Sequence, residues 1–154
     1  MIKKLINEWK SRVTLKNLDM KNWSICPFAH KVLEVPVIVV NTLTEQEIEN
    51  RLKEIAGNEV TVFTVGSTAP SFDEIDKICH SLNKKHKEFI FLPDHPEIKN
   101  YIAGHETGNQ NFSLILAQSK ESLLKHRELL LKTDYYSFWT PEYQKEIFSY
   151  GEEE

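Results

Sequence analysis

Cys26 is the residue whose sequence surroundings are best suited to covalent chemistry. Pro27 follows it, and proline is favoured at the first position of a helix, so Cys26 is expected to cap a helix N-terminus. Backbone N–H groups and the positive end of the helix dipole stabilise a thiolate there, and His30, about one turn further on, adds charge when protonated. The pattern predicts a reactive thiol or a metal ligand at Cys26, with His30 at the same site. The alternative is a buried Cys-Pro turn, because free cysteines are among the most buried residues.

A second group of chemistry-bearing side chains lies in residues 93–111. Imidazole and carboxylate groups together suit zinc binding, or a general base and the group that orients it. Long connections inside compact domains are often functional. The candidates are His95 and His105 for catalysis, and Asp94, Glu106, Asn109 and Asn111 for ligand binding. The spacing of the two histidines matches no dense ligand motif, so no metal ligand is assigned. The alternative is a solvated loop in which Asp94 caps a short helix ending near residue 102.

A Cys–His dyad would have to join these two regions. Cys26 precedes the first expected strand, whereas Pro93 follows the third. If those strands are parallel, the two positions lie at opposite ends of the sheet. A shared site therefore requires residues 93–111 to fold back over the sheet, or the third strand to run the other way.

Residues 135–150 carry seven aromatic side chains, more than a solvated terminal helix needs. Aromatic residues are enriched at the cores of protein interfaces. One interpretation is a homo-oligomer surface formed by Tyr135, Tyr136, Phe138, Trp139 and Tyr143. The other is that these side chains cover one face of the domain's own core, and the sequence leaves both open.

Composition narrows the classes of function. The chain has 154 residues and a net charge of −4, and its 19 basic residues include only three arginines. Arginine is the usual residue for bidentate recognition of phosphates and bases, so a nucleic-acid partner is not expected. No apolar run approaches the roughly 18 residues of a membrane span, and Asn7 and Glu8 interrupt any signal-peptide core. The sequence therefore predicts a cytoplasmic protein without a membrane partner. Two cysteines are too few for a disulfide framework or a four-thiolate zinc site.

The elements that must position these side chains alternate between helices and strands. Apolar residues at helical spacing predict a helix over residues 2–12. Helix starts are indicated by capping residues followed by an acidic residue or a proline, at Thr44, Ser71, Ser119 and Thr140. Runs of β-branched and apolar residues predict strands at 35–40, 60–65, 88–92 and 112–117.

This order predicts an α/β fold. Strand–helix–strand steps imply right-handed parallel crossovers, whereas strands three and four, joined without a long helix, are candidates for an antiparallel pair. We expect a single domain over residues 1–150 with a four-stranded mixed, mostly parallel sheet packed with helices. A disordered acidic tail is expected over residues 151–154.

Most of the chain resembles an uncharacterised bacterial family, a domain of unknown function that opens with a Trp-bearing helix and a Leu-Cys-Pro-Phe-Ala motif. Trp9 and residues 25–29 (Ile-Cys-Pro-Phe-Ala) match that opening. Residues 91–96 are similar to the family's Phe-His-Pro segment with an insertion, and residues 109–116 to its Asn-containing loop and strand. The family's Arg-Ser-Pro-x-Pro stretch and a later arginine have no counterpart here, so no role of that arginine carries over. The resemblance implies a fold and a bacterial origin, and no activity.

The sequence therefore predicts a small-molecule-binding or enzymatic domain that uses residues 93–111, with Cys26 as a second contributor. No cofactor is indicated. The alternative is a non-catalytic structural or interaction domain that self-associates through its aromatic C-terminus.

Overall fold

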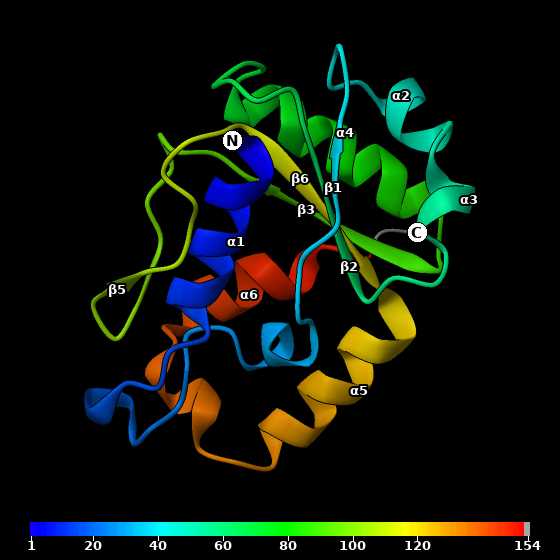
Figure 1. Cartoon of the computed structure of the whole chain (residues 1–154). Coiled ribbons are helices and arrows are strands. Elements are labelled where there is room, and N and C mark those ends of the chain that lie inside the picture. The colour runs from blue at the N-terminus through cyan, green and yellow to red at the C-terminus, as the bar shows by residue number, and fades with distance from the viewer. Residues whose placement is uncertain (153–154) are drawn as a thin grey trace.

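A four-stranded sheet in the order β1-β2-β6-β3 forms the centre of the computed structural model, which describes residues 1–152, Lys31 by its backbone alone (Figure 1). The strands are β1 (Val37–Val39), β2 (Val60–Thr64), β3 (Phe89–Asp94) and β6 (Leu114–Ser119). β1 and β2 are parallel, whereas β6 is antiparallel to both β2 and β3. The predicted α/β fold with a four-stranded mixed sheet is confirmed. The expectation of a mostly parallel sheet is wrong, because only one of the three pairs of neighbouring strands is parallel.

The position of β6 explains this difference. β1, β2 and β3 run in the same direction, as the predicted helical crossovers require. β6 returns antiparallel and inserts between β2 and β3, so that Leu116 pairs with Val62 on one side and with Leu92 on the other. Insertion of the last strand separates two strands that share a direction, and no local sequence pattern encodes it.

One face of the sheet is covered by α2 (Glu45–Glu49), α3 (Leu52–Ile55) and α4 (Phe72–Lys85). The predicted caps are present, because the side chains of Thr44 and Ser71 accept hydrogen bonds from backbone N–H groups three residues on. The helix that begins after Thr44 is interrupted at Arg51, whose N–H donates to a carbonyl only three residues back. The chain therefore tightens there and starts a second short helix.

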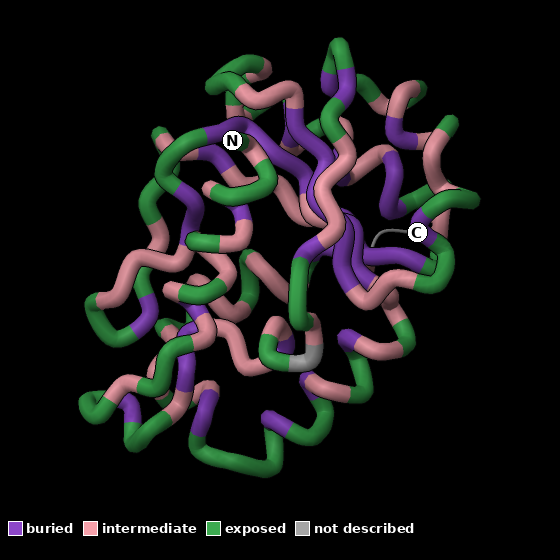
Figure 2. The backbone as a smooth tube through the Cα atoms, viewed as in Figure 1, coloured by how far each residue is buried: buried purple, intermediate pink, exposed green. Residues whose placement is uncertain are grey.

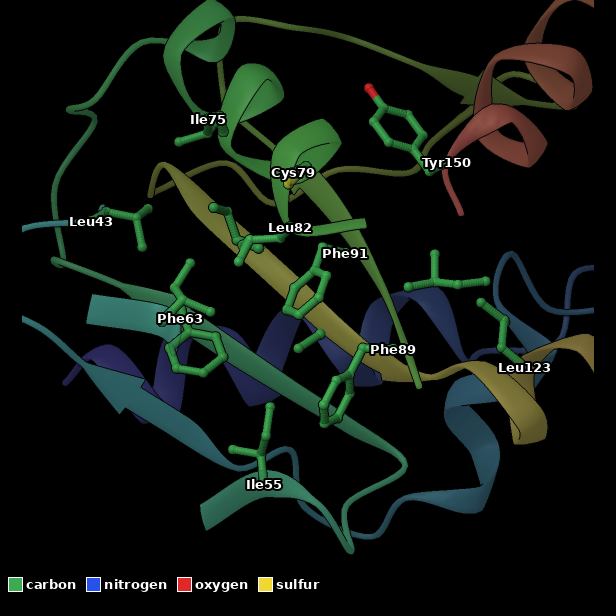
Figure 3. Close-up of a cluster of buried hydrophobic side chains, with 14 of the residues drawn as sticks. Leu43, Ile55, Phe63, Ile75, Cys79, Leu82, Phe89, Phe91, Leu123 and Tyr150 are labelled. Atoms are coloured by element: carbon green, nitrogen blue, oxygen red, sulfur yellow. The ribbon is translucent and has the colours of Figure 1, made fainter. Parts of the chain in front are cut away.

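The core under α4 is built from large apolar side chains of both layers. Phe63, Phe91 and Ile115 of the sheet pack with Ile75, Cys79 and Leu82 of α4 (Figure 3). Ile75, Cys79 and Leu82 are four and three residues apart, which places them on one face of α4. Buried residues are concentrated along the central strands of the sheet (Figure 2).

The other face carries α1 (Ile2–Val13), α5 (Lys120–Leu131) and α6 (Pro141–Ser149), which lie on the opposite side of the sheet from α4 (Figure 1). Three short 3₁₀ helices join them on this side: η1 (Leu18–Met20), η2 (Pro27–Lys31) and η3 (Tyr135–Phe138). α1 packs its Ile6 against Val62 and Leu114 of the sheet. Helices therefore cover both faces of the sheet.

Residues 93–111 are not a solvated loop capped by a short helix. The segment continues β3 to Asp94 and then forms a two-stranded hairpin from β4 (Tyr101–Ile102) and β5 (His105–Glu106). Ile102 is buried, in a cluster with Val13 and Tyr135. The hairpin therefore packs onto the helices of the second face.

A disordered tail was expected over residues 151–154, of which Glu153 and Glu154 lie outside the described residues. The carbonyl of Gly151 accepts a hydrogen bond from Lys120 Nζ. Among the helices of residues 1–152, none is long and apolar enough to cross a membrane.

Candidate functional site

A cavity of about 210 Å³ lies between the second face of the sheet and the helices that cover it. Residues directly opposite each other on neighbouring strands share a face, and the row Val62, Leu116 and Leu92 crosses three strands and lines the cavity. The other walls come from α1, η2, α5, the hairpin segment and the aromatic C-terminal segment. The site therefore lies over a face of the sheet, not at the ends of its strands.

The cavity is large enough for a small organic molecule. An engineered apolar cavity of about 150 Å³ in another protein holds benzene. The lining here is mostly aliphatic and aromatic, with a few polar side chains among them. This combination is typical of sites that bury an apolar ligand and orient it by a small number of polar contacts.

Arg127 is a charged side chain of this cavity that is almost fully buried. It occupies the inward stripe of α5 with Leu123 and Leu130, at spacings of four and three residues, and is 8% exposed. Its guanidinium lies over the ring of Phe148, 4.4 Å from the centroid. Burial lowers the pKa of Arg127, which Tyr136 and Glu152 partly offset. An arginine nevertheless stays protonated in proteins.

No carboxylate forms an ion pair with Arg127 among residues 1–152. Its N–H groups also donate to no described side chain or carbonyl. Buried charges are usually paired and hydrogen-bonded, because their desolvation is costly. Arg127 therefore lines the cavity, and also a second hollow that contains Phe148 and Glu152, and no acid among the described residues forms an ion pair with its charge.

Gln118 is a second buried polar residue in the lining. It follows Leu114 and Leu116 on the same face of β6 and lies between Val60 and Ile90 of the neighbouring strands. Its Oε1 is buried and has no hydrogen-bond partner among the described residues. Most buried polar groups of native proteins do have a partner. Gln118 is therefore a polar side chain in the wall of the cavity whose amide oxygen has no partner among the described residues.

Cys26 lines the cavity, but its electrostatic environment differs from the sequence prediction. It caps a 3₁₀ helix, and the backbone N–H groups of Ala29 and Phe28 act to lower its pKa. Burial of the thiol has the larger effect and raises the pKa of Cys26 above its ordinary value. The neutral thiol is therefore favoured. His30 is exposed and does not line the cavity.

Asp94 is the candidate of the 93–111 segment that reaches the cavity. Its Oδ2 accepts hydrogen bonds of 2.8 Å from both the backbone N–H and the side-chain amide of Asn109. Burial raises the pKa of Asp94 despite these donors. Asn109 also bonds the backbone N–H and carbonyl of Phe112, at 2.7 and 3.0 Å. Its side chain therefore closes the base of the segment, and all its polar atoms are engaged within the chain.

The two candidate histidines lie outside the cavity walls. His95 is buried, with Nε2 2.7 Å from the carbonyl of Thr68 and Nδ1 accepting from the N–H of Glu97, so Nε2 carries the proton. His105 contacts the carboxylate of Asp19 at 2.9 Å. The cavity thus brings Cys26 together with Asp94, and not with either histidine.

The remaining two candidates, Glu106 and Asn111, do not line the cavity. Glu106 forms an ion pair with Lys99 at 3.0 Å, which lowers the pKa of Glu106, and Asn111 is exposed. No group of three histidine, cysteine or acidic side chains in residues 1–152 is placed to hold a metal ion.

The hairpin segment is held across the cavity by α1. The indole N–H of Trp9 donates to the carbonyl of Thr107 at 2.9 Å, and Arg12 donates to the carbonyls of Glu106 and Gly108. Thr107 and Gly108 line the cavity as well. Residues 93–111 therefore serve as a wall whose backbone is fixed by a helix more than 80 residues earlier in the chain.

The aromatic segment, residues 135–150, forms the adjoining wall, and the hydroxyl of Tyr143 reaches Thr107 of the hairpin segment. Tyr135 is 1% exposed, and its hydroxyl donates to the carbonyl of Ile25. Its ring contacts those of Trp23, Tyr136 and Trp139 in edge-on arrangements. These side chains cover the domain's own core, as one of the two sequence interpretations held. A homo-oligomer stays a prediction.

Sequence reasoning missed Arg127 and Gln118, although each interrupts a pattern. Gln118 is the polar member of the alternating positions 114, 116 and 118 in β6, and Arg127 is the charged member of the stripe 123, 127 and 130 in α5. A polar residue within an apolar stripe is the sequence signal that could have identified both residues as buried polar groups.

In comparisons with known proteins, no family model, curated protein or solved structure matches the chain. The resemblance to a bacterial domain of unknown function therefore stays a prediction, and the cavity itself is the basis for inferring a function.

Proposed function

We propose that this domain binds a small, mainly apolar organic molecule in the cavity between its sheet and α1, η2, α5 and the aromatic segment. The observation that carries the proposal is a mostly apolar cavity of about 210 Å³ whose lining includes the buried side chains of Gln118 and Arg127, to which the described residues provide no hydrogen bond. In an apolar pocket, a small number of polar side chains fixes the orientation of a bound ligand.

Binding has more support than catalysis. A nucleophilic cysteine needs a depressed pKa or an adjacent base. Burial raises the pKa of Cys26, and the walls include neither His95 nor His105. Cys26 and Asp94 act in this proposal as parts of the wall, so the two regions selected from the sequence serve one site without forming a dyad.

The test is the binding of a neutral apolar probe, indole, to the full chain, measured by calorimetry. Ala29 lines the cavity from η2, so Ala29→Phe should fill it and abolish binding. Ala56→Phe is the matched control, because Ala56 is exposed at the end of α3. Saturable binding by the wild type and by Ala56→Phe alone supports the proposal. Absence of binding by the wild type, or full binding by Ala29→Phe, contradicts it.

Self-association through residues 135–143 has weaker support, because Tyr135 is directed inward. Light scattering of the full chain tests it directly. The cytoplasmic location predicted from the sequence likewise stays a prediction.

A further inference from the structure

The charge of Arg127 indicates what kind of molecule the cavity accepts; this inference rests on the proposed function. The side chain is 8% exposed, and the described residues provide neither an ion pair nor a hydrogen bond for it. The guanidinium carbon Cζ lies over the ring of Phe148, 4.4 Å from its centroid. The N–H groups of a guanidinium point outward in its plane, in a fork that matches the two oxygens of a carboxylate. No described side chain or carbonyl accepts from these N–H groups, so they are available to an acceptor.

The other charged and titratable groups near Arg127 do not substitute for such an acceptor. Glu152 influences its pKa but forms no ion pair with it, and Tyr136 is a phenol whose own pKa is raised to about 12 by burial, so it is neutral. His126 is its neighbour in α5 and packs its ring against Phe28, 5.5 Å between centroids. None of these side chains supplies a buried negative charge.

Gln118 supplies a second polar contact in the same cavity. Which end of its amide is oxygen and which is nitrogen follows from hydrogen bonds, and Oε1 has none among the described residues. The amide can therefore present NH₂ to an acid group or its oxygen to a donor. Apart from these polar positions, the sheet and α5 offer aliphatic side chains such as Val62, Leu116 and Leu130.

We propose that the cavity of this domain binds a small apolar carboxylic acid, with the carboxylate paired to Arg127 and contacted by Gln118, and the apolar body against Val62 and Leu116. A carboxylate fits better than a phosphate monoester, because one arginine balances a single negative charge. A phosphate dianion would leave a second charge buried without a partner. The volume of about 210 Å³ limits the body to a ring or a short chain.

The experiment compares two probes of the same shape, 3-phenylpropanoate and 3-phenylpropanamide, by calorimetry with the full chain. The acid should bind wild type at least about tenfold more tightly than the amide, as expected for a buried charge-assisted pair. Arg127→Met should bind both probes equally, at the affinity of the wild type for the amide. Arg51→Met, which removes an arginine that lies outside the cavity and pairs with Glu54, should keep the preference for the acid.

The outcomes separate this inference from the proposed function. Equal affinities for the two probes in wild type, or an acid preference that survives in Arg127→Met, would overturn the inference and leave the cavity as a binding site. Binding of neither probe by the wild type would overturn both. If Arg127→Met does not fold, Arg127→Gln takes its place, because it removes the charge and keeps a polar end group. The comparison of the two probes in wild type needs no variant.

Discussion

The carboxylate of Asp94 accepts two hydrogen bonds from Asn109, one from its backbone N–H and one from its side-chain amide, each 2.8 Å long. These two hydrogen bonds join the end of β3 to the residues that precede β6, and they close the base of residues 93–111. Gly108 lies directly against this pair, because a Cβ there would come 2.7 Å from Asp94 Oδ1. The shape of the hairpin wall of the cavity therefore depends on one buried carboxylate and one glycine.

Replacement of Gly108 tests this close approach. Gly108→Ala should lower the free energy of unfolding by about 1–3 kcal/mol, because the added methyl group forces the Asp94 carboxylate from its place. Gly57→Ala is the matched control, since nothing lies within 4 Å of the position of its Cβ. That control should be neutral or slightly stabilising. Urea denaturation measures both, and equal stabilities of the two variants would show that the 94–109 closure tolerates the methyl group.

The buried carboxyl of Asp94 predicts a pH dependence of stability. Its pKa is raised in the folded state, so the unfolded state loses this proton at lower pH than the folded state does. Any contribution from Asp94 is therefore fully present below its unfolded pKa and is lost as the pH rises through the higher folded pKa.

The variant Asp94→Asn should flatten this part of the stability–pH curve, because the amide oxygen can still accept from Asn109 but does not ionise. Asp73→Asn, at an exposed position in the first turn of α4, serves as the control and should leave the slope unchanged. Thermal unfolding from pH 4 upward measures the effect. A slope that is the same in Asp94→Asn and in wild type would assign the pH dependence to other groups.

Asn83 predicts a stability effect on the other side of the sheet. Its side chain donates to the carbonyl of Phe91 at 3.0 Å and accepts from the N–H of Phe91 at 2.8 Å, so it satisfies the backbone of the edge strand β3. Asn83→Ala leaves two buried backbone groups unpaired and should cost about 1–3 kcal/mol for each group that water cannot reach. Asn111→Ala, at an exposed side chain, should stay within about 0.5 kcal/mol of wild type. Chemical denaturation distinguishes the two, and a neutral Asn83→Ala would mean that water replaces the amide.

Local sequence patterns predicted the elements well where the determining contacts are also local. The helix starts after Thr44, Ser71, Ser119 and Thr140 follow from a side-chain oxygen that accepts from an N–H three residues on, and all four bonds are present. The insertion of β6 was not predictable in this way, because it depends on pairing with strands about 25 and 50 residues away.

The candidate site shows the same division. Cys26 and Asp94 were selected as chemically suited residues, and both line the cavity. Their partners could not be predicted, because Asn109 and the surrounding walls meet them only through the tertiary fold. His95 was selected for its chemistry, yet its ring bonds the carbonyl of Thr68 and the N–H of Glu97. Residue type alone does not distinguish a catalytic histidine from one that holds a turn.

Replacement of the buried Arg127 should cost unusually little stability for the removal of a buried charge. Removing one member of a buried ion pair typically costs about 3–5 kcal/mol, because the other member is left unpaired. Arg127 has no such partner among the described residues, and its ring contact with Phe148 contributes about 0.5–2 kcal/mol. Since Arg127→Met also removes the desolvation cost, its stability should lie within about 1 kcal/mol of wild type in the absence of ligand. A loss of several kcal/mol in urea denaturation would reveal a partner that the described residues do not provide.

Cys26 decides between a binding wall and a nucleophile. Because burial raises the pKa of its thiol, little thiolate is present at neutral pH, and alkylation by iodoacetamide should be slower than that of a free cysteine. The rate should continue to rise with pH beyond the point at which a free thiol levels off. Peptide mass spectrometry separates Cys26 from Cys79, which is fully buried and should react only after unfolding. Alkylation of Cys26 at pH 7 as fast as that of a free thiolate would instead require a positive group or base beside the thiol, and would return Cys26 to the role that its position before Pro27 suggests.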